Sequence, residues 1–213
     1  MTTPPLPTPP IRLLLVDDHP LMREGVMAIA QRQPDMLVVG EAASGTEAVE
    51  RYAALQPDVT LMDLQMPGMD GMKAIRSIRG SWPDARILVL TTYQGDAQAW
   101  LALKAGAAGY LVKTALRATL MDAVRKVHAG GRWVAPEVVL ELANHAGDEM
   151  LTARELDVLQ RVAAGHSNRE IGAMLSVTED TIKARLKAIL AKLGARDRTH
   201  AVTIAMRRGL IQN

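Results

Sequence analysis

Short apolar runs alternate with helical patterns from residue 11 to about residue 128, and this alternation constrains the fold more than any other feature of the chain. Strands that are joined through helices need crossover connections, which are typical of a parallel sheet covered by helices. Proline and glycine turns mark the breaks between segments. We expect strands near 11–16, 36–41, 58–62, 86–91 and 109–112, and helices near 20–33, 45–55, 70–80, 95–105 and 115–128.

Polar side chains that can react or bind a ligand follow four of these apolar runs. The first run leads into Asp17 and Asp18, and the third ends at Asp63. The fourth ends at Thr91, and the fifth is followed by Lys113. Ligands of parallel α/β sheets bind outside the carboxyl ends of the strands. We therefore expect these side chains to converge although they are far apart in the sequence.

Three carboxylates at one place repel one another, by about 4 kcal/mol for a pair ~4 Å apart at an effective dielectric of ~20. A divalent cation relieves this repulsion. Mg²⁺ fits because it takes oxygen ligands and usually combines one or two carboxylates with phosphate oxygens. With the metal and Lys113 balancing the charge, Asp63 is suited to attack a phosphoryl group and hold it as an acyl phosphate. Thr91 would then donate a hydrogen bond to the phosphoryl oxygens.

Structural interpretations of the same residues stay open. Asp17 or Asp18 taken singly could cap the following helix, and Asp63 could initiate a turn. Tyr110, in the fifth strand, could serve packing alone. His19 has no companion at metal-ligand spacing, so we expect a solvated or capping side chain rather than a ligand.

Residues 11 to about 128 resemble the receiver domain of two-component response regulators. The matching elements are Asp17-Asp18, Asp63 before Met66-Pro67-Gly68-Met69-Asp70-Gly71, Thr91, and Gly109-Tyr110-Leu111-Val112-Lys113, in family order and spacing. The resemblance implies an α/β, flavodoxin-like fold with a five-stranded parallel sheet in the order 2-1-3-4-5.

The same resemblance implies roles for the residues. Asp63 would accept phosphate from a cognate histidine kinase, and Lys113 would be the cationic partner of that phosphate. Thr91 and Tyr110 would be the switch pair that moves when phosphate arrives. Mg²⁺ would be held, directly or through water, by Asp17, Asp18, Asp63 and the backbone carbonyl of Gln65.

Length and composition predict two folded domains without disulfides. The chain has 213 residues, more than a typical single domain, and it contains 48% hydrophobic residues and no Cys. The lack of Cys agrees with a reducing, cytoplasmic location. Residues 1–10 hold five of the 11 prolines and are expected to be a disordered lead-in rather than a signal peptide. No apolar run approaches the ~20 residues of a membrane helix, so we expect no membrane association.

Positive charge is concentrated in the C-terminal part of the chain. Residues 1–147 carry 14 basic and 15 acidic side chains, and residues 148–213 carry 11 and 8, within an overall net charge of +2. Asp197 is the only acid in residues 181–208, which contain Lys183, Arg185, Lys187, Lys192, Arg196, Arg198, Arg207 and Arg208. Such clustering is typical of surfaces that bind a phosphate backbone.

The basic part has the pattern of an all-α, four-helix domain. Thr152-Ala153-Arg154-Glu155 and Ser167-Asn168-Arg169-Glu170 both fit the capping box that begins a helix. Gly165 and Gly194 stand where helices are expected to end. A tight turn at Ser176-Val177-Thr178 indicates a helix-turn-helix. The helices are expected near 153–164, 168–175, 179–193 and 198–208.

The third of these helices has two different faces. Its apolar stripe consists of Ile182, Leu186, Ile189, Leu190 and Leu193. The opposite side carries Ala184, Lys187, Ala188 and Ala191, with Lys183 and Arg185 at the flanks. Small and basic side chains together suit a recognition helix in the major groove. An ordinary solvated amphipathic helix is the alternative.

Residues 151–211 resemble the LuxR-type DNA-binding domain through Leu151-Thr152-Ala153-Arg154-Glu155, Gly165-His166-Ser167-Asn168-Arg169-Glu170-Ile171, Thr181-Ile182-Lys183 and Leu190-Ala191-Lys192-Leu193-Gly194. The chain then consists of the receiver at 11–128, a linker at 129–150 and this domain at 151–213. This arrangement indicates the NarL/FixJ class of response regulators. Arg185 stands where the family commonly has His, which leaves the base preference open. Contacts with double-stranded promoter DNA are expected from Ser167, Asn168, Thr181, Lys183, Ala184, Arg185, Lys187 and Arg198.

The sequence therefore predicts a transcription regulator rather than an enzyme, in which phosphorylation of Asp63 controls homodimerisation and DNA binding. One rival is a phosphatase or phosphotransferase of the haloacid dehalogenase type. That family's pattern has a second Asp two residues after the nucleophile, where this chain has Gln65. Another rival is a constitutive DNA binder whose receiver only dimerises.

Overall fold

The computed structural model describes residues 9–92, 96–113, 116–134, 138–139 and 151–211. Most of the predicted lead-in and most of the predicted linker lie outside these residues. The chain divides into two compact units, of which the first contains a β-sheet and the second contains the helical residues 151–211. Among the described residues, no helix has the length and apolar character needed to cross a membrane.

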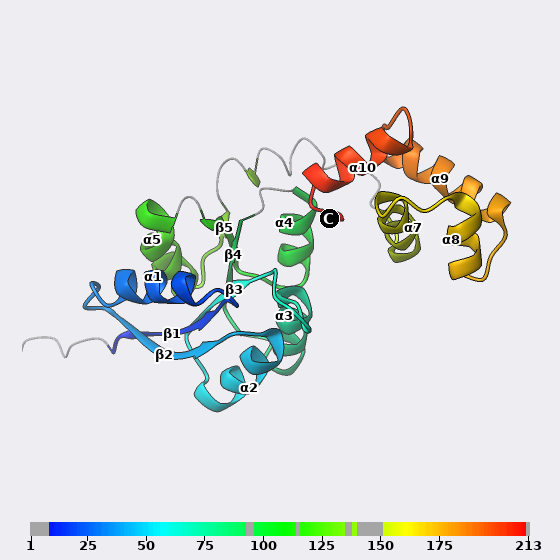
Figure 1. Cartoon of the computed structure of the whole chain (residues 1–213). Coiled ribbons are helices and arrows are strands. Elements are labelled where there is room, and N and C mark those ends of the chain that lie inside the picture. Colours follow the sequence, from blue (N-terminus) through cyan, green and yellow to red (C-terminus); the bar gives the residue numbers. More distant parts are fainter. Residues whose placement is uncertain (1–8, 93–95, 114–115, 135–137, 140–150, 212–213) are drawn as a thin grey trace, which may run out of the picture. The chain divides into compact units, whose positions relative to one another are not determined.

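The first unit is an alternation of strands and helices around a parallel sheet (Figure 1). The sheet has the order β2-β1-β3-β4-β5-β6, which confirms the predicted order of the first five strands. The strands are β1 (Ile11–Val16), β2 (Met36–Ala42), β3 (Val59–Asp63), β4 (Ile87–Thr91), β5 (Gly109–Val112) and β6 (Trp133–Val134). The helices are α1 (Pro20–Ala30), α2 (Gly45–Leu55), α3 (Gly71–Ser81), α4 (Asp96–Lys104) and α5 (Leu116–His128).

A sixth strand corrects the prediction of a five-stranded sheet. β6 lies in the segment that the sequence assigned to the linker, and it pairs in parallel with β5 through Trp133 and Val134. The amide of Trp133 donates to the carbonyl of Ala108, and the ammonium of Lys126 lies 5.4 Å from the centre of the Trp133 ring. A strand of two residues has no alternation that could be recognised in the sequence.

The middle strands are buried on both faces because helices cover the sheet on both sides. All five residues of β3 and of β4 are buried. One side of the sheet packs against α1 and α5 through a cluster that includes Leu13, Leu61, Leu88, Val26 and Val124. Each such side chain stabilises the fold by roughly 1.5–3 kcal/mol when fully buried. The core therefore fixes the positions at which β1, β3 and β4 end.

The second unit contains α7 (Ala153–Ala163), α8 (Asn168–Met174), α9 (Glu179–Leu193) and α10 (Arg198–Arg207). Both predicted capping boxes are confirmed, at Thr152 and at Ser167. Gly165 and Gly194 have positive φ angles of 88° and 60°, as expected of residues that end helices. Ser176 also adopts a left-handed conformation, with φ 55°, in the turn between α8 and α9.

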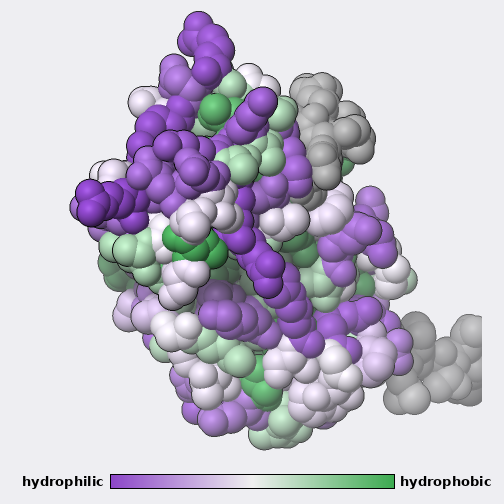
Figure 2. All heavy atoms as spheres, turned by 90° about the vertical axis from the view of Figure 1, so that its right-hand side faces the viewer, coloured by the Kyte–Doolittle hydropathy of each residue, from purple (hydrophilic) through white to green (hydrophobic). Residues whose placement is uncertain are grey.

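The second unit has its own apolar core. Val158, Ile171, Ile182, Ile189 and Ala201 are fully buried and come from all four helices. This burial confirms the apolar stripe predicted for α9. On the face shown in Figure 2, hydrophilic side chains predominate and hydrophobic ones form small, separate patches.

Two glycines of the same helix, α3, differ in their surroundings and provide a test of the packing. A Cβ atom on Gly71 would clash with the backbone of Asp63 and Leu64, whereas a Cβ on Gly80 would have nothing within 4 Å. We expect Gly71→Ala to lower the free energy of unfolding by about 1–3 kcal/mol, because backbone atoms must move. Gly80→Ala should raise it by roughly 0.5–1 kcal/mol. Calorimetric melting of the full chain measures both, and equal melting temperatures for the two variants would contradict this packing.

Candidate functional site

Three charged residues meet at the carboxyl edge of the sheet, as the sequence predicted. Asp17 follows β1, Asp63 ends β3 and Lys113 follows β5. The Asp63 residue is 2% exposed and Asp17 is 5% exposed. The Lys113 Nζ atom lies 2.6 Å from Asp17 Oδ2 and 2.9 Å from Asp63 Oδ2. One buried ammonium group therefore bridges two buried carboxylates that are far apart in the sequence.

The charges of this bridge are coupled. Burial raises the pKa of the Asp63 carboxyl, and the charge of Asp17 adds to the rise, while Lys113 opposes it. Burial also disfavours the charged form of Lys113, but its hydrogen bonds to Asp17 and Asp63 outweigh that effect and raise its pKa. Lys113 is therefore cationic at neutral pH. It supplies one positive charge to a site with more than one carboxylate.

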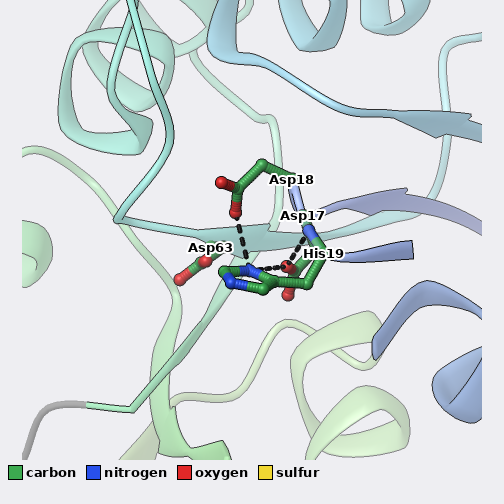
Figure 3. Close-up of side chains that lie close together, drawn as sticks. All are labelled: Asp17, Asp18, His19 and Asp63. Atoms are coloured by element: carbon green, nitrogen blue, oxygen red, sulfur yellow. Dashed lines mark hydrogen bonds and ion pairs between the residues drawn. The ribbon is translucent and has the colours of Figure 1, made fainter. Parts of the chain in front are cut away.

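Asp18 and His19 complete the cluster on its outer side (Figure 3). The His19 Nδ1 atom lies 2.8 Å from Asp18 Oδ1 and 3.3 Å from Asp17 Oδ1, and 71% of the His19 side chain is exposed. The approach to Asp18 is close but lacks hydrogen-bond geometry, so Asp18 Oδ1 is buried without a donor among the described residues. The exposure of His19 was expected, but its ring does not cap α1. Asp17 and Asp18 directly precede His19 in the sequence, and the fold adds Asp63 to this group.

The donor set fits a hard divalent cation. Ligand atoms of Asp17, Asp18, His19 and Asp63 all lie within 4.8 Å of one another. Carboxylate oxygens are the protein ligands that Mg²⁺ prefers. The buried Asp18 oxygen without a donor is an available ligand atom. The backbone amide of Gln65 hydrogen-bonds to the Asp63 carboxylate, and the predicted role of the Gln65 carbonyl as a ligand stays a prediction.

The predicted switch pair lies next to these acids. Thr91 ends β4 and Tyr110 lies in the adjacent strand β5, and both residues are fully buried. Burial raises the pKa of the Tyr110 phenol, and a hydrogen bond with Thr91 opposes the rise. The two side chains therefore interact in this structure, with the tyrosine turned into the interior.

Arg23 is a supporting residue that the sequence analysis did not identify. Its Nη1 atom donates to the carbonyl oxygen of Asp17 at 2.7 Å, and its Nε atom donates to Glu41 Oε2 at 2.9 Å. The Arg23 side chain is 18% exposed and the Glu41 side chain is 41% exposed, so their ion pair is only partly shielded from water. Arg23 thus ties α1 to the ends of β1 and β2. No spacing in the sequence marks this contact, because Glu41 is 18 residues away.

The residues expected to contact DNA occupy different environments in the second unit. Lys183, Ala184 and Lys187 are exposed on α9, and Thr181 and Arg185 are half-buried. Lys183 makes ion pairs with Glu179 at 3.1 Å and with Asp180 at 3.3 Å. Lys187 and Ala184 are therefore on the open side of the helix, as predicted from its periodicity.

The remaining three candidates lie around α8 and α10. The Ser167 hydroxyl donates to Glu170 Oε2 at 2.7 Å as part of the capping box. Asn168 is half-buried, and its Oδ1 has no donor among the described residues. Arg198 is exposed and donates to the carbonyl of His166 at 2.9 Å. Ser167 and Arg198 thus already have structural partners within the unit.

Two basic residues of the C-terminal cluster face the protein interior instead of solvent. Lys192 Nζ lies 3.0 Å from Glu155 Oε2, and both side chains are largely buried. Burial raises the pKa of Glu155, but hydrogen bonds from Thr152 and Lys192 outweigh it and the pKa is lowered. Arg208 is also buried. The sequence therefore overestimated the number of cations available to a nucleic acid.

Comparisons with known proteins agree with both halves of the structure. Residues 13–125 match the response regulator receiver domain, and residues 149–205 match the bacterial regulatory proteins of the luxR family. The response regulator protein VraR of Staphylococcus aureus is 40% identical over 207 residues, which cover 95% of this chain and 99% of the relative.

Solved structures give the same result. The response regulator ChrA of a heme-sensing two-component system is 38% identical with a TM-score of 0.57, covering 96% of this chain and all of that one. RcsB from Salmonella enterica serovar Typhimurium, bound to the promoter P1flhDC with a phosphomimetic, is 27% identical with a TM-score of 0.69, covering 91% and 97% of the two chains. This chain therefore belongs to the response regulators that combine a receiver domain with a LuxR-type DNA-binding domain.

Proposed function

We propose that this protein regulates transcription by accepting a phosphoryl group on Asp63 from a histidine kinase and binding promoter DNA through α9. The observation that carries the proposal is the Lys113 ammonium group shared by the buried carboxylates of Asp17 and Asp63. A cation fixed 2.9 Å from a carboxylate at the carboxyl edge of a parallel sheet suits a phosphoryl acceptor.

Phosphoryl transfer follows from this geometry. A carboxylate oxygen of Asp63 attacks phosphorus, the bond from phosphorus to the donor imidazole breaks, and an acyl phosphate forms. Lys113, which pairs with the free carboxylate, then has the phosphoryl oxygens as partners. Asp17, Asp18 and Asp63 would hold Mg²⁺, which neutralises phosphoryl charge when bound. Gln65 stands where a phosphatase of the haloacid dehalogenase type has its acid, which favours a regulator over an enzyme.

The switch residues connect the acceptor to the rest of the receiver. A phosphoryl group adds charge and hydrogen-bond acceptors. It draws the Thr91 hydroxyl, which interacts with Tyr110 in this structure. A change in that interaction biases a two-state receiver. We propose that the phosphorylated state forms the homodimer, and that a symmetric dimer reads two half-sites of its DNA.

DNA binding is supported by the second unit and by the relatives. α9 presents Ala184 and Lys187 on its exposed side, while its apolar stripe is buried in the core. This division of faces suits a helix that enters the major groove. The response regulator RcsB, whose fold match covers 93% of this chain and 98% of its own, has been solved bound to DNA.

Mg²⁺ binding at the acid cluster has a testable consequence for stability. We expect Mg²⁺ to raise the melting temperature of the wild-type protein, by the equivalent of about 2.7 kcal/mol at 100 times its Kd. Asp18→Asn should remove most of this rise, because the buried Asp18 Oδ1 has no hydrogen-bond donor among the described residues and is available as a ligand. Without Mg²⁺ the variant should be at least as stable as wild type, because carboxylate repulsion is reduced. Asp84→Asn, at an exposed position, is the matched control, and a full Mg²⁺ response in Asp18→Asn would contradict the assignment.

Phosphoryl acceptance is tested by the intact mass of the protein after incubation with acetyl phosphate and Mg²⁺. We expect a single phosphoryl adduct in wild type and in the Asp84→Asn control. Asp63→Asn should show none, because an amide lacks the nucleophilic oxygen. An adduct of the same yield in Asp63→Asn would show that another residue is the acceptor.

A further inference from the structure

We propose that Arg154 and Arg185 together hold one phosphate of the DNA backbone, so that Arg185 acts as a backbone contact and not as a reader of bases. This inference rests on the proposed DNA-binding function. The two arginines line a pocket between α7, the turn before α9 and α9 itself.

The position of Arg185 on α9 shows which way its side chain lies. Arg185 and Lys192 are seven residues apart, about two turns at 3.6 residues per turn, so they share one flank of the helix. Lys192 reaches Glu155 of α7 at 3.0 Å. That flank therefore faces α7, while Ala184 and Lys187 are exposed on another side. The half-buried Arg185 is thus turned away from the centre of the predicted base-reading face.

An open pocket of about 370 Å³ lies at this flank, lined by Arg154, Asp157, Leu175, Val177 and Arg185. Arg154 belongs to the first turn of α7, and Leu175 and Val177 lie at the turn between α8 and α9. The pocket thus has one arginine from α7 and one from α9 in its lining.

The charges around the pocket leave it positive. The Asp157 carboxylate is engaged by Arg161, whose Nε and Nη2 atoms both lie 3.1 Å from Asp157 Oδ1. Within the described part of the chain, neither Arg154 nor Arg185 has an acidic partner at ion-pair distance. Arginine binds phosphate oxygens through two parallel hydrogen bonds, and it keeps its charge at any physiological pH. The first turn of α7 adds a favourable dipole for an anion.

A DNA phosphodiester is the anion that this position favours. When a recognition helix enters the major groove, its exposed face meets the bases and its flanks run beside the two backbones. The pocket opens on such a flank, next to the helix that carries Lys187. Both arginines would then position the helix on the duplex without selecting its sequence.

DNA affinity of the full chain, after treatment with acetyl phosphate and Mg²⁺, is measured by fluorescence anisotropy with an AT-rich and a GC-rich duplex over a series of salt concentrations. We expect Arg154→Ala and Arg185→Ala each to weaken binding by the same factor on both duplexes. Each should also lower the slope of log affinity against log salt by up to about 0.9, the value for one phosphate contact. The double variant should lose less than the product of the two single losses, because both arginines hold the same phosphate.

Control variants separate this proposal from its alternatives. Arg132→Ala removes an exposed arginine of the receiver unit and should leave the slope unchanged. Lys187→Ala should change the ratio of affinities for the two duplexes. A change of that ratio in Arg185→Ala, or independent losses in the double variant, would overturn the shared clamp. If wild type binds DNA and the arginine variants match it, only the clamp fails; if wild type binds neither duplex, the proposed function fails with it.

Discussion

The ion pairs of Lys113 with Asp17 and Asp63 are the interactions on which the receiver site depends. They join the ends of β1, β3 and β5, which are far apart in the sequence. The three groups are buried, so each charge needs the others, because an unpaired buried charge is strongly unfavourable. Arg23 supports the same arrangement by holding the Asp17 carbonyl. An arriving phosphoryl group therefore changes the balance of a coupled set of charges rather than one isolated carboxylate.

Much of this arrangement was predictable from the sequence. The apolar runs and turn residues predicted the first five strands of the sheet. The residues at the ends of four of these runs predicted the acids, the hydroxyl and the amine. The bounds of α9 match the prediction, because Thr178 caps its start and Gly194 ends it in a left-handed conformation. These signals are local, and a local signal can be read in a single sequence.

Features that depend on long-range contacts were not predictable. β6 is too short to show a period, and Arg23 meets Glu41 only because α1 packs beside β2. Asp63 comes close to His19 only through the fold, because the two residues are far apart in the sequence. Lys192 looked like a surface cation, but its partner Glu155 comes from another helix, 37 residues away. The same packing turns the flank of Arg185 toward α7.

In the proposed function, phosphorylation of the buried acid site controls DNA binding by the second unit. The most direct measurement is the affinity of the full chain for DNA fragments selected by this protein, before and after treatment with acetyl phosphate and Mg²⁺, beside Asp63→Asn. We expect tighter binding by phosphorylated wild type and no change in the variant. Equal affinity of the phosphorylated and unphosphorylated wild-type protein would contradict it and indicate a constitutive DNA binder.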